Sequence, residues 1–250
     1  MKVAEQIRLK IKSIPESEPF GYADLDIAPN DFFTAAKALE RLQKQGEIKK
    51  ISKGMFYRPE MSIFGVLPAD SNAILNRYLF RDGKRIAYIT SYSLFNSLGL
   101  TTQMAFKIKV ATSGKRIKID EYYLNVNSVK SYVAVTDQNY KLLGYLDAIK
   151  DIKKIPDCSV KQAVIRLRGI LKSLNTTEIG ELIDLALNYP TRTRALLGAI
   201  LENIDPKLNL NKLKNSLNPL TKINLSIDEV ALQTIKKWNI NATTLRRNQF

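Results

Sequence analysis

The sequence contains no histidine and only one cysteine, Cys158. Without histidine, the chain cannot form zinc sites of the usual His/Cys type, and it cannot use Ser-His-Asp or Cys-His nucleophilic catalysis. A single cysteine cannot form a disulfide within the chain, which fits a reducing compartment. An enzyme built from this sequence would therefore depend on carboxylates, lysine, tyrosine or a metal bound by carboxylates.

Long apolar runs are also absent. No uninterrupted apolar stretch reaches the length needed to cross a bilayer. The first 14 residues mix charged and apolar side chains and contain no small-residue cleavage site, so we expect no signal peptide. These features predict a cytoplasmic protein without a membrane partner.

Basic residues outnumber acidic ones, 39 to 24, giving a formal net charge of +15 and a pI near 9.7. Residues 1–60 carry 11 bases and 9 acids, residues 61–135 carry 10 and 4, and residues 136–250 carry 18 and 11. A basic protein is suited to polyanionic partners such as DNA or RNA. Because the excess is spread along the chain, charge alone does not separate a nucleic-acid-binding protein from a generally basic one.

The N-terminal 60 residues show an ordered series of element signals. Apolar spacing predicts a helix over 3–14, a short helical turn near 21–27, and a third helix over 31–45 that Gly46 ends. Two short segments around Ser52-Lys53-Gly54 then predict a hairpin with an irregular register. Helix, short helix, helix and hairpin is the order of a winged helix-turn-helix domain.

The third helix has two chemically distinct faces. Ala35, Ala38, Leu39 and Leu42 form an apolar stripe, and polar residues at similar spacing form another face. In a winged helix-turn-helix domain the third helix enters the major groove, and wing cations neutralise phosphates. The predicted DNA-binding residues are Thr34, Lys37, Arg41 and Lys44 on the helix and Lys49, Lys50, Lys53 and Arg58 on the wing. The alternative is that these charges only solvate an exposed surface.

A second basic surface is predicted in the middle of the chain. Residues 106–110 and 116–119 alternate apolar and basic side chains, which predicts a hairpin with one apolar and one basic face. The basic face comprises Lys107, Lys109, Arg116 and Lys118. It would contact nucleic acid or an acidic partner, or its lysines would only protect an edge strand from aggregation.

The predicted fold class is α+β, in three regions. Residues 1–60 form the winged helix-turn-helix domain, 69–136 a mixed α/β region, and 137–250 a helical region that includes a helix over 226–238. The stretch between residues 59 and 68 is expected to be a linker.

Carboxylates offer weak catalytic signals. Residues 47–49 have the acid-x-lysine spacing of metal-dependent nucleases, but no strand-borne second carboxylate lies suitably upstream. Glu178, Glu181 and Asp184 are spaced along one predicted helix, where acids near the start more simply complement the helix dipole. We therefore predict no catalytic residues, no metal site and no cofactor.

Three segments resemble a known family. The stretch "AAKALERLQKQGEIKKISKGMFYRP" (35–59) resembles the winged-helix start of AbiEi-type antitoxins and of a related uncharacterised bacterial family. "TSYSLFNSLGLTTQ" (90–103) and "YPTRTRALLGAILE" (189–202) resemble their middle and C-terminal signatures.

The resemblance implies a non-enzymatic antitoxin of a type IV toxin–antitoxin, or abortive-infection, system of phage defence. Such antitoxins repress their own operon by binding double-stranded operator DNA, often cooperatively on inverted repeats. They counteract a nucleotidyltransferase-like toxin through the C-terminal region, without a stable complex. Two alternatives stay open: a stand-alone winged-helix transcriptional regulator, and a metal-dependent nucleic-acid-processing enzyme.

Overall fold

The computed structural model describes residues 3–121, 123–225, 227 and 229–242 and shows a mixed α+β protein with several small sheets. The chain forms two compact units. The first unit comprises residues 1–83 and 116–127, and the second comprises 84–115 and 128–250. The stretch expected to be a linker therefore lies inside the first unit, and the expected boundary at 136/137 lies inside the second.

The first unit begins with helices and a small sheet and ends with two antiparallel strands. Its elements are α1 (Val3–Ser13), β1 (Pro19–Gly21), the 3-10 turns η1 (Tyr22–Leu25) and η2 (Pro29–Asp31), α2 (Phe32–Lys44), β2 (Lys49–Ser52), β3 (Met55–Tyr57), β4 (Met61–Ser62), β5 (Gly65–Val66), α3 (Ser71–Leu79), β6 (Phe80–Arg81), β10 (Lys118–Glu121) and the start of β11 (Leu124–Lys130).

Helices α1 and α2 pack against each other through the apolar stripes that the sequence predicts. Ile7 and Ile11 of α1 lie in one buried cluster with Ala35 and Leu39 of α2, together with residues of the sheet. Helix α2 ends next to Gly46, whose φ of +76° is readily adopted only by a residue without a side chain. The predicted helix over 31–45 is confirmed to within one residue at each end.

The sheet of the first unit has the strand order β1-β3-β2, and both pairings are antiparallel. The predicted hairpin with an irregular register is confirmed, because the β2–β3 pairing shifts between Lys50 and Ser52. Strand β1 was not predicted, since Pro19-Phe20-Gly21 is too short to show alternation and contains two residues that are rare in strands.

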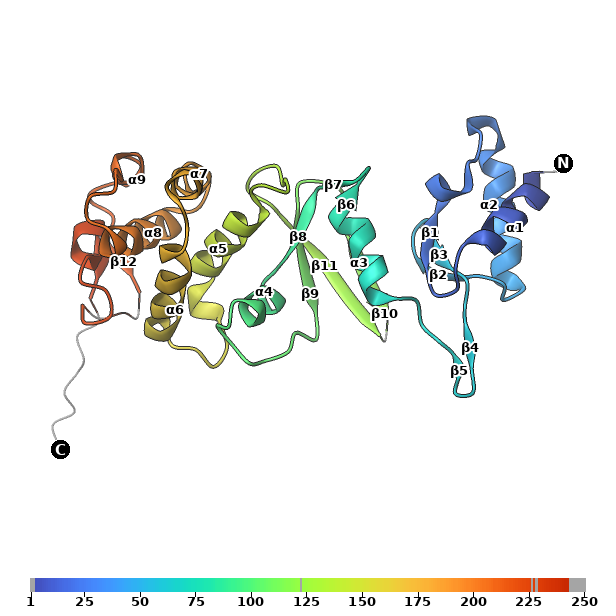
Figure 1. Cartoon of the computed structure of the whole chain (residues 1–250), viewed down its shortest axis with the longest axis horizontal. Helices are drawn as coiled ribbons and strands as arrows, with labels where there is room; N and C mark the ends of the chain where they lie inside the picture. Colours follow the sequence, from blue (N-terminus) through green and yellow to red (C-terminus); the bar gives the residue numbers. More distant parts are fainter. Residues whose placement is uncertain (1–2, 122, 226, 228, 243–250) are drawn as a thin grey trace. The chain divides into compact units, whose positions relative to one another are not determined.

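The stretch expected to be a linker contains a second hairpin. Strands β4 and β5 pair antiparallel, with Met61 opposite Val66 and Ser62 opposite Gly65. This hairpin, drawn in blue-green, extends away from the β1-β3-β2 sheet (Figure 1). Strand β10 pairs antiparallel with β11.

The second unit is a strand pair followed by a group of helices. Its elements are β7 (Lys84–Arg85), β8 (Ala87–Thr90), α4 (Tyr92–Ser97), β9 (Ile108–Thr112), the end of β11, α5 (Tyr140–Lys150), η3 (Ile152–Lys154), α6 (Val160–Lys172), α7 (Thr176–Ala186), α8 (Thr191–Ile204), α9 (Asn211–Asn215), β12 (Ile223–Asn224), η4 (Ile235–Trp238) and β13 (Ile240–Asn241).

Helix α8 lies at the centre of this unit. It contacts α5, α6, α9 and η4, so residues 195–201 are all buried. This position explains why the segment "ALLGAIL" contains no polar residue: no side of the helix faces water. Within the described residues, every helix is too short or too polar to cross a bilayer.

Two predicted elements are wrong. Strand β9 pairs with β8 and strand β10 with β11, so residues 106–119 do not form the expected hairpin. In the stretch expected as a helix over 226–238, the described residues form turns and the 3-10 helix η4 rather than an α-helix. Apolar residues three or four apart can also be buried by successive tight turns, which apolar spacing alone does not exclude. Strands β12 and β13 add a parallel pair to the region expected to be helical.

Candidate nucleic-acid interface

Helix α2 presents a polar face opposite its buried stripe. Thr34, Lys37, Arg41 and Lys44 are all exposed. Lys44 pairs with Glu40 at 3.0 Å, and the hydrogen bond and charge of Lys44 lower the pKa of Glu40. Within the described residues, the side chains of Lys37 and Arg41 form neither a hydrogen bond nor an ion pair. These two cations are therefore available to an external anion.

The β2–β3 hairpin carries three more exposed cations. Lys49, Lys50 and Lys53 point away from the core, whereas Ile51 between them is buried. None of the three lysines forms an ion pair with another described residue. Gly54 has a φ of +76° and closes the turn that displays Lys53.

Tyr22 shows that the start of α2 and the hairpin turn lie at the same end of the unit. Its ring centroid is 4.8 Å from that of Phe32, the first residue of α2, and 6.1 Å from that of Phe56 in β3. A Cβ atom added at Gly54 would lie 3.6 Å from the Tyr22 ring. Tyr22 therefore packs between the N-terminal end of α2 and the turn of the hairpin.

Arg58 has a different environment from the other predicted cations. It follows β3 at the end away from the turn, and its guanidinium donates to the carbonyl oxygens of Lys12 at 2.9 Å and Ile14 at 2.7 Å. It also pairs with Glu16 at 3.1 Å. A cation at the C-terminal end of α1 satisfies carbonyl groups that the helix leaves unpaired. We therefore leave Arg58 out of the candidate interface, which keeps the other seven predicted residues.

Phe33 is a residue of this face that sequence reasoning missed. It is 82% exposed on α2, one turn before Lys37 and next to Thr34. An aromatic ring this exposed contributes little to the stability of the fold. In DNA-binding proteins, Phe side chains contact thymine methyl groups in the major groove. The available signal was the Phe32-Phe33 pair, because adjacent helical residues cannot both face the core.

The four residues of the predicted second basic surface are divided between the two units. Lys107 and Lys109 belong to the second unit, and Arg116 and Lys118 belong to the first. All four are exposed, and Lys109 and Lys118 lie in strands β9 and β10, which do not pair with each other. Phe106, expected on the apolar face, is among the most exposed apolar residues of the chain.

Three of the four carboxylates considered for catalysis, Glu47, Glu178 and Asp184, have structural partners. Arg8 donates to both oxygens of Glu47, at 3.2 and 2.5 Å, and Glu178 forms a capping box with Asn175 at the start of α7. Asp184 pairs with Lys212 at 2.5 Å. Among the described residues, no group of three or more His, Cys, Asp or Glu is arranged to hold a metal ion.

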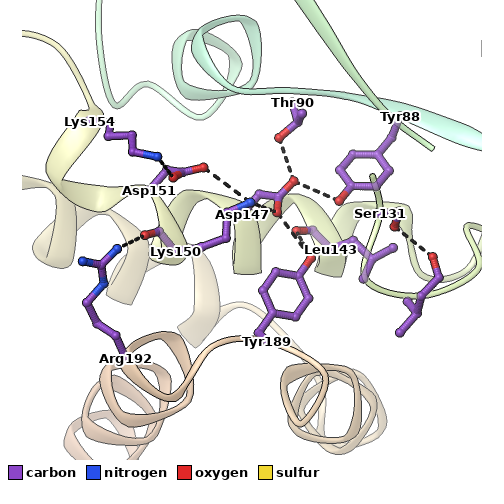
Figure 2. Close-up of polar contacts among 11 residues, drawn as sticks. Tyr88, Thr90, Ser131, Leu143, Asp147, Lys150, Asp151, Lys154, Tyr189 and Arg192 are labelled. Carbon is purple, nitrogen blue, oxygen red and sulfur yellow. Dashed lines mark hydrogen bonds and ion pairs between the residues drawn. The ribbon is translucent and has the colours of Figure 1, made fainter. Parts of the chain in front are cut away.

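The most buried charged cluster lies in the second unit around Asp147 of α5 (Figure 2). Its Oδ2 accepts hydrogen bonds from Tyr88 at 2.9 Å and Thr90 at 2.7 Å. Its Oδ1 accepts one from Lys150 at 2.9 Å and lies 3.4 Å from the hydroxyl of Tyr189. Sequence reasoning missed this cluster, although Asp147 is the only charged residue between 142 and 149.

The Asp147 cluster favours one protonation state. Burial, together with the charge of Asp147, raises the pKa of both Tyr88 and Tyr189, so both hydroxyls stay protonated as donors. Burial opposes the charge on Lys150, but the charge and hydrogen bond of Asp147 outweigh it and raise the pKa of the lysine. Each charged or hydroxyl group of the cluster has a hydrogen-bond partner within the cluster. This arrangement is typical of a structural cluster.

Comparison with known proteins gives a family but no activity. Residues 6–179 match a family of unknown function (DUF6088). No curated protein matches the chain. A similar solved structure is the crystal structure of the RV2827C protein from Mycobacterium tuberculosis, with 12% identity and a TM-score of 0.48, covering 89% of this chain and 84% of that one.

Proposed function

The chain belongs to the family of unknown function (DUF6088), and we propose that this member is a DNA-binding antitoxin that represses its own operon. In this proposal the first unit is a winged helix-turn-helix: α2 is the recognition helix and the β2–β3 hairpin is the wing. The protein acts without catalysis, metal or cofactor.

The observation that carries the DNA-binding proposal is the position of Lys37 and Arg41. Both are exposed on the face of α2 opposite the core, and neither side chain forms a hydrogen bond or an ion pair with another described residue. Exposed cations are normally solvated or paired within the protein, as Lys44 is with Glu40. The lysines of the hairpin extend the same positive surface, and Tyr22 places the hairpin turn beside the start of α2. A helix with flanking basic strands of this kind fits the major groove and its adjacent phosphates.

Replacing Lys49, Lys50 and Lys53 together with alanine tests the role of the wing. If each lysine contacts a phosphate, removing it makes the salt dependence of binding less steep. The negative slope of the logarithm of the association constant against log salt, for double-stranded promoter DNA, is expected to shrink in magnitude by about 0.9 for each lysine removed. Fluorescence anisotropy with a fragment from upstream of the protein's own gene measures this slope at several salt concentrations.

The matched control removes the same charge elsewhere. Lys130, Lys141 and Lys207 are exposed lysines of the second unit. Their triple alanine variant is expected to keep the wild-type salt slope. Equal slopes for wild type and the wing variant, or an equal loss in both triple variants, contradict phosphate contact by the wing.

The antitoxin part of the proposal rests on the segments 90–103 and 189–202. These segments resemble the AbiEi-type signatures, and they meet in the second unit. Their first residues, Thr90 and Tyr189, both approach Asp147, and Phe95 shares a buried cluster with residues 195–201. The second unit is accordingly the part proposed to counteract a nucleotidyltransferase-like toxin. Growth rescue of cells that express the toxin encoded beside this gene tests that role.

A stand-alone winged-helix regulator would use the same DNA-binding surface. Such a regulator differs from an antitoxin only in having no cognate toxin. A protein that binds DNA but does not rescue the growth of toxin-expressing cells would favour this alternative. The nuclease alternative is the less favoured one, because the Glu47 carboxylate accepts hydrogen bonds from Arg8.

A further inference from the structure

Phe33 places an apolar ring at one end of a row of cations. It is 82% exposed, and Lys37 and Arg41 follow it at intervals of four residues along α2, so the three side chains lie in one row on the helix. Lys53 extends the positive surface from the hairpin turn, which Tyr22 holds beside the start of α2. A molecule that covers this row must therefore offer both anionic groups and an apolar group.

The fold does not require an aromatic ring at this position. The neighbouring Phe32 is the residue that packs against the unit, with its ring centroid 4.8 Å from that of Tyr22. Successive residues of a helix point about 100° apart, so Phe33 points away from this contact. The apolar stripe that holds α2 against α1 is formed by other residues, among them Ala35 and Leu39. The ring of Phe33 is therefore available to a ligand.

Duplex DNA offers one apolar group in its major groove. The edges of all four base pairs present hydrogen-bond donors and acceptors there, and thymine adds a C5 methyl group. Burying a polar base edge under an apolar ring costs free energy, because the ring returns no hydrogen bond. Burying a methyl group under the same ring is favourable. Thymine is therefore the base that suits Phe33.

The position of Phe33 on α2 also suits contact with a base. In a helix-turn-helix domain the N-terminal residues of the recognition helix reach the base edges. Phe33 is the second residue of α2, whereas Lys44 is the last. A protein partner fits this surface less well. An apolar protein surface laid over Phe33 would remove water from Lys37 and Arg41 without supplying the negative charge that DNA supplies as phosphates.

We propose that Phe33 is a specificity-determining residue that contacts the 5-methyl group of a thymine in the major groove. This inference rests on the proposed function and deepens it, because it adds the base that the start of the recognition helix reads. A contact with a methyl group distinguishes thymine from cytosine, and also from uracil, which pairs with adenine in the same way but lacks the methyl group. The operator is accordingly expected to carry thymine where it faces the N-terminal end of α2.

Replacing every thymine of the promoter fragment with uracil tests the proposal. Uracil keeps the hydrogen-bonding groups and the phosphates and removes only the methyl groups. Wild type is expected to bind the uracil fragment about four-fold more weakly for each methyl group that Phe33 contacts. In Phe33→Ala, the ratio of the two affinities is expected to move toward one by the same factor. Fluorescence anisotropy at fixed salt measures the four dissociation constants.

Phe64→Ala is the matched control. Phe64 is 92% exposed in the same unit, but it lies in the turn between β4 and β5, outside α2 and the wing. This variant is expected to keep the wild-type ratio of affinities. Because Phe33 and Phe64 are both highly exposed, the melting temperature of each variant, followed by circular dichroism, should equal that of wild type.

Three results would contradict the proposal. Equal ratios for wild type and Phe33→Ala, with wild type bound to the promoter, would overturn the thymine contact and leave the proposed function standing. An equal loss of discrimination in Phe64→Ala would overturn the assignment of the contact to Phe33. A wild-type protein that binds neither fragment would refute the DNA-binding proposal itself, and the thymine contact with it.

Discussion

Replacing Gly198 with alanine is expected to destabilise the second unit by about 2–4 kcal/mol, although glycine-to-alanine changes inside helices usually stabilise by up to about 1 kcal/mol. Gly198 lies in the buried helix α8, and a Cβ atom there would overlap the six-membered ring of Trp238. Thermal or urea unfolding followed by circular dichroism measures the change.

The ring of Trp238 has little freedom to move away. Its indole nitrogen donates to Glu202 at 2.6 Å, and the side chain is 1% exposed. Accommodating the extra methyl group therefore requires helix α8 to shift or the hydrogen bond to Glu202 to break. Both responses disturb the central helix of the unit, and this is the reason for the large expected effect.

Two further variants make this prediction specific. Gly180 lies in α7 with no atom within 4 Å of an added Cβ, so Gly180→Ala should be neutral or stabilising. Combining Gly198→Ala with Trp238→Leu should cost less than the sum of the two single variants, because the smaller side chain removes the overlap. A Gly198→Ala protein as stable as wild type would contradict the packing described here.

Replacing Asp147 with alanine is the second change with a large expected effect, a loss of about 3–5 kcal/mol. The variant leaves Tyr88, Thr90 and Lys150 without their shared acceptor, in a site where little water can replace it. Denaturant unfolding measures the loss, and a double-mutant cycle with Lys150→Ala separates the contribution of the ion pair from that of the neutral donors.

Asp184 is the matched control for Asp147. It also forms an ion pair with a lysine, but its side chain is 56% exposed. Exposed pairs contribute about 0–1 kcal/mol, so Asp184→Ala should change stability little. Equal losses in the two variants would mean that burial does not determine the contribution of these carboxylates.

Much of the local structure could be predicted from the sequence, because it depends on neighbouring residues. The two faces of α2 follow from apolar residues three and four apart, and the β2–β3 hairpin follows from a glycine-containing turn. The start of α3 at Asp70, whose side chain accepts from the amide of Asn72, follows from a standard capping preference.

The remaining features depend on residues far apart in the chain. Asp147 meets Tyr88 and Tyr189 across 59 and 42 residues, a distance over which periodicity carries no information. Strand β9 alternates as a hairpin strand would, yet it lies between β8 and β11 and does not pair with the segment that follows it. The β4–β5 hairpin escaped prediction because its tip carries Ile63 and Phe64 where a turn residue was expected.

The candidate interface was predicted best where exposure follows from helix geometry. Lys37 and Arg41 had to be exposed once Ala38 and Leu42 were assigned to the core. Arg58 could not be assigned in this way, since its contacts with Lys12 and Ile14 depend on how α1 packs against the sheet.

The central claim of this account is that α2 binds DNA, and the affinity of a Lys37→Ala, Arg41→Ala double variant for promoter DNA tests it most directly. The control variant, Lys130→Ala with Lys141→Ala, has the same net charge. A gel-shift titration at fixed salt is expected to show binding weakened at least about 10-fold for the α2 variant, with the control close to wild type. An α2 variant that binds as tightly as the control would contradict the assignment of α2 as the DNA-binding helix.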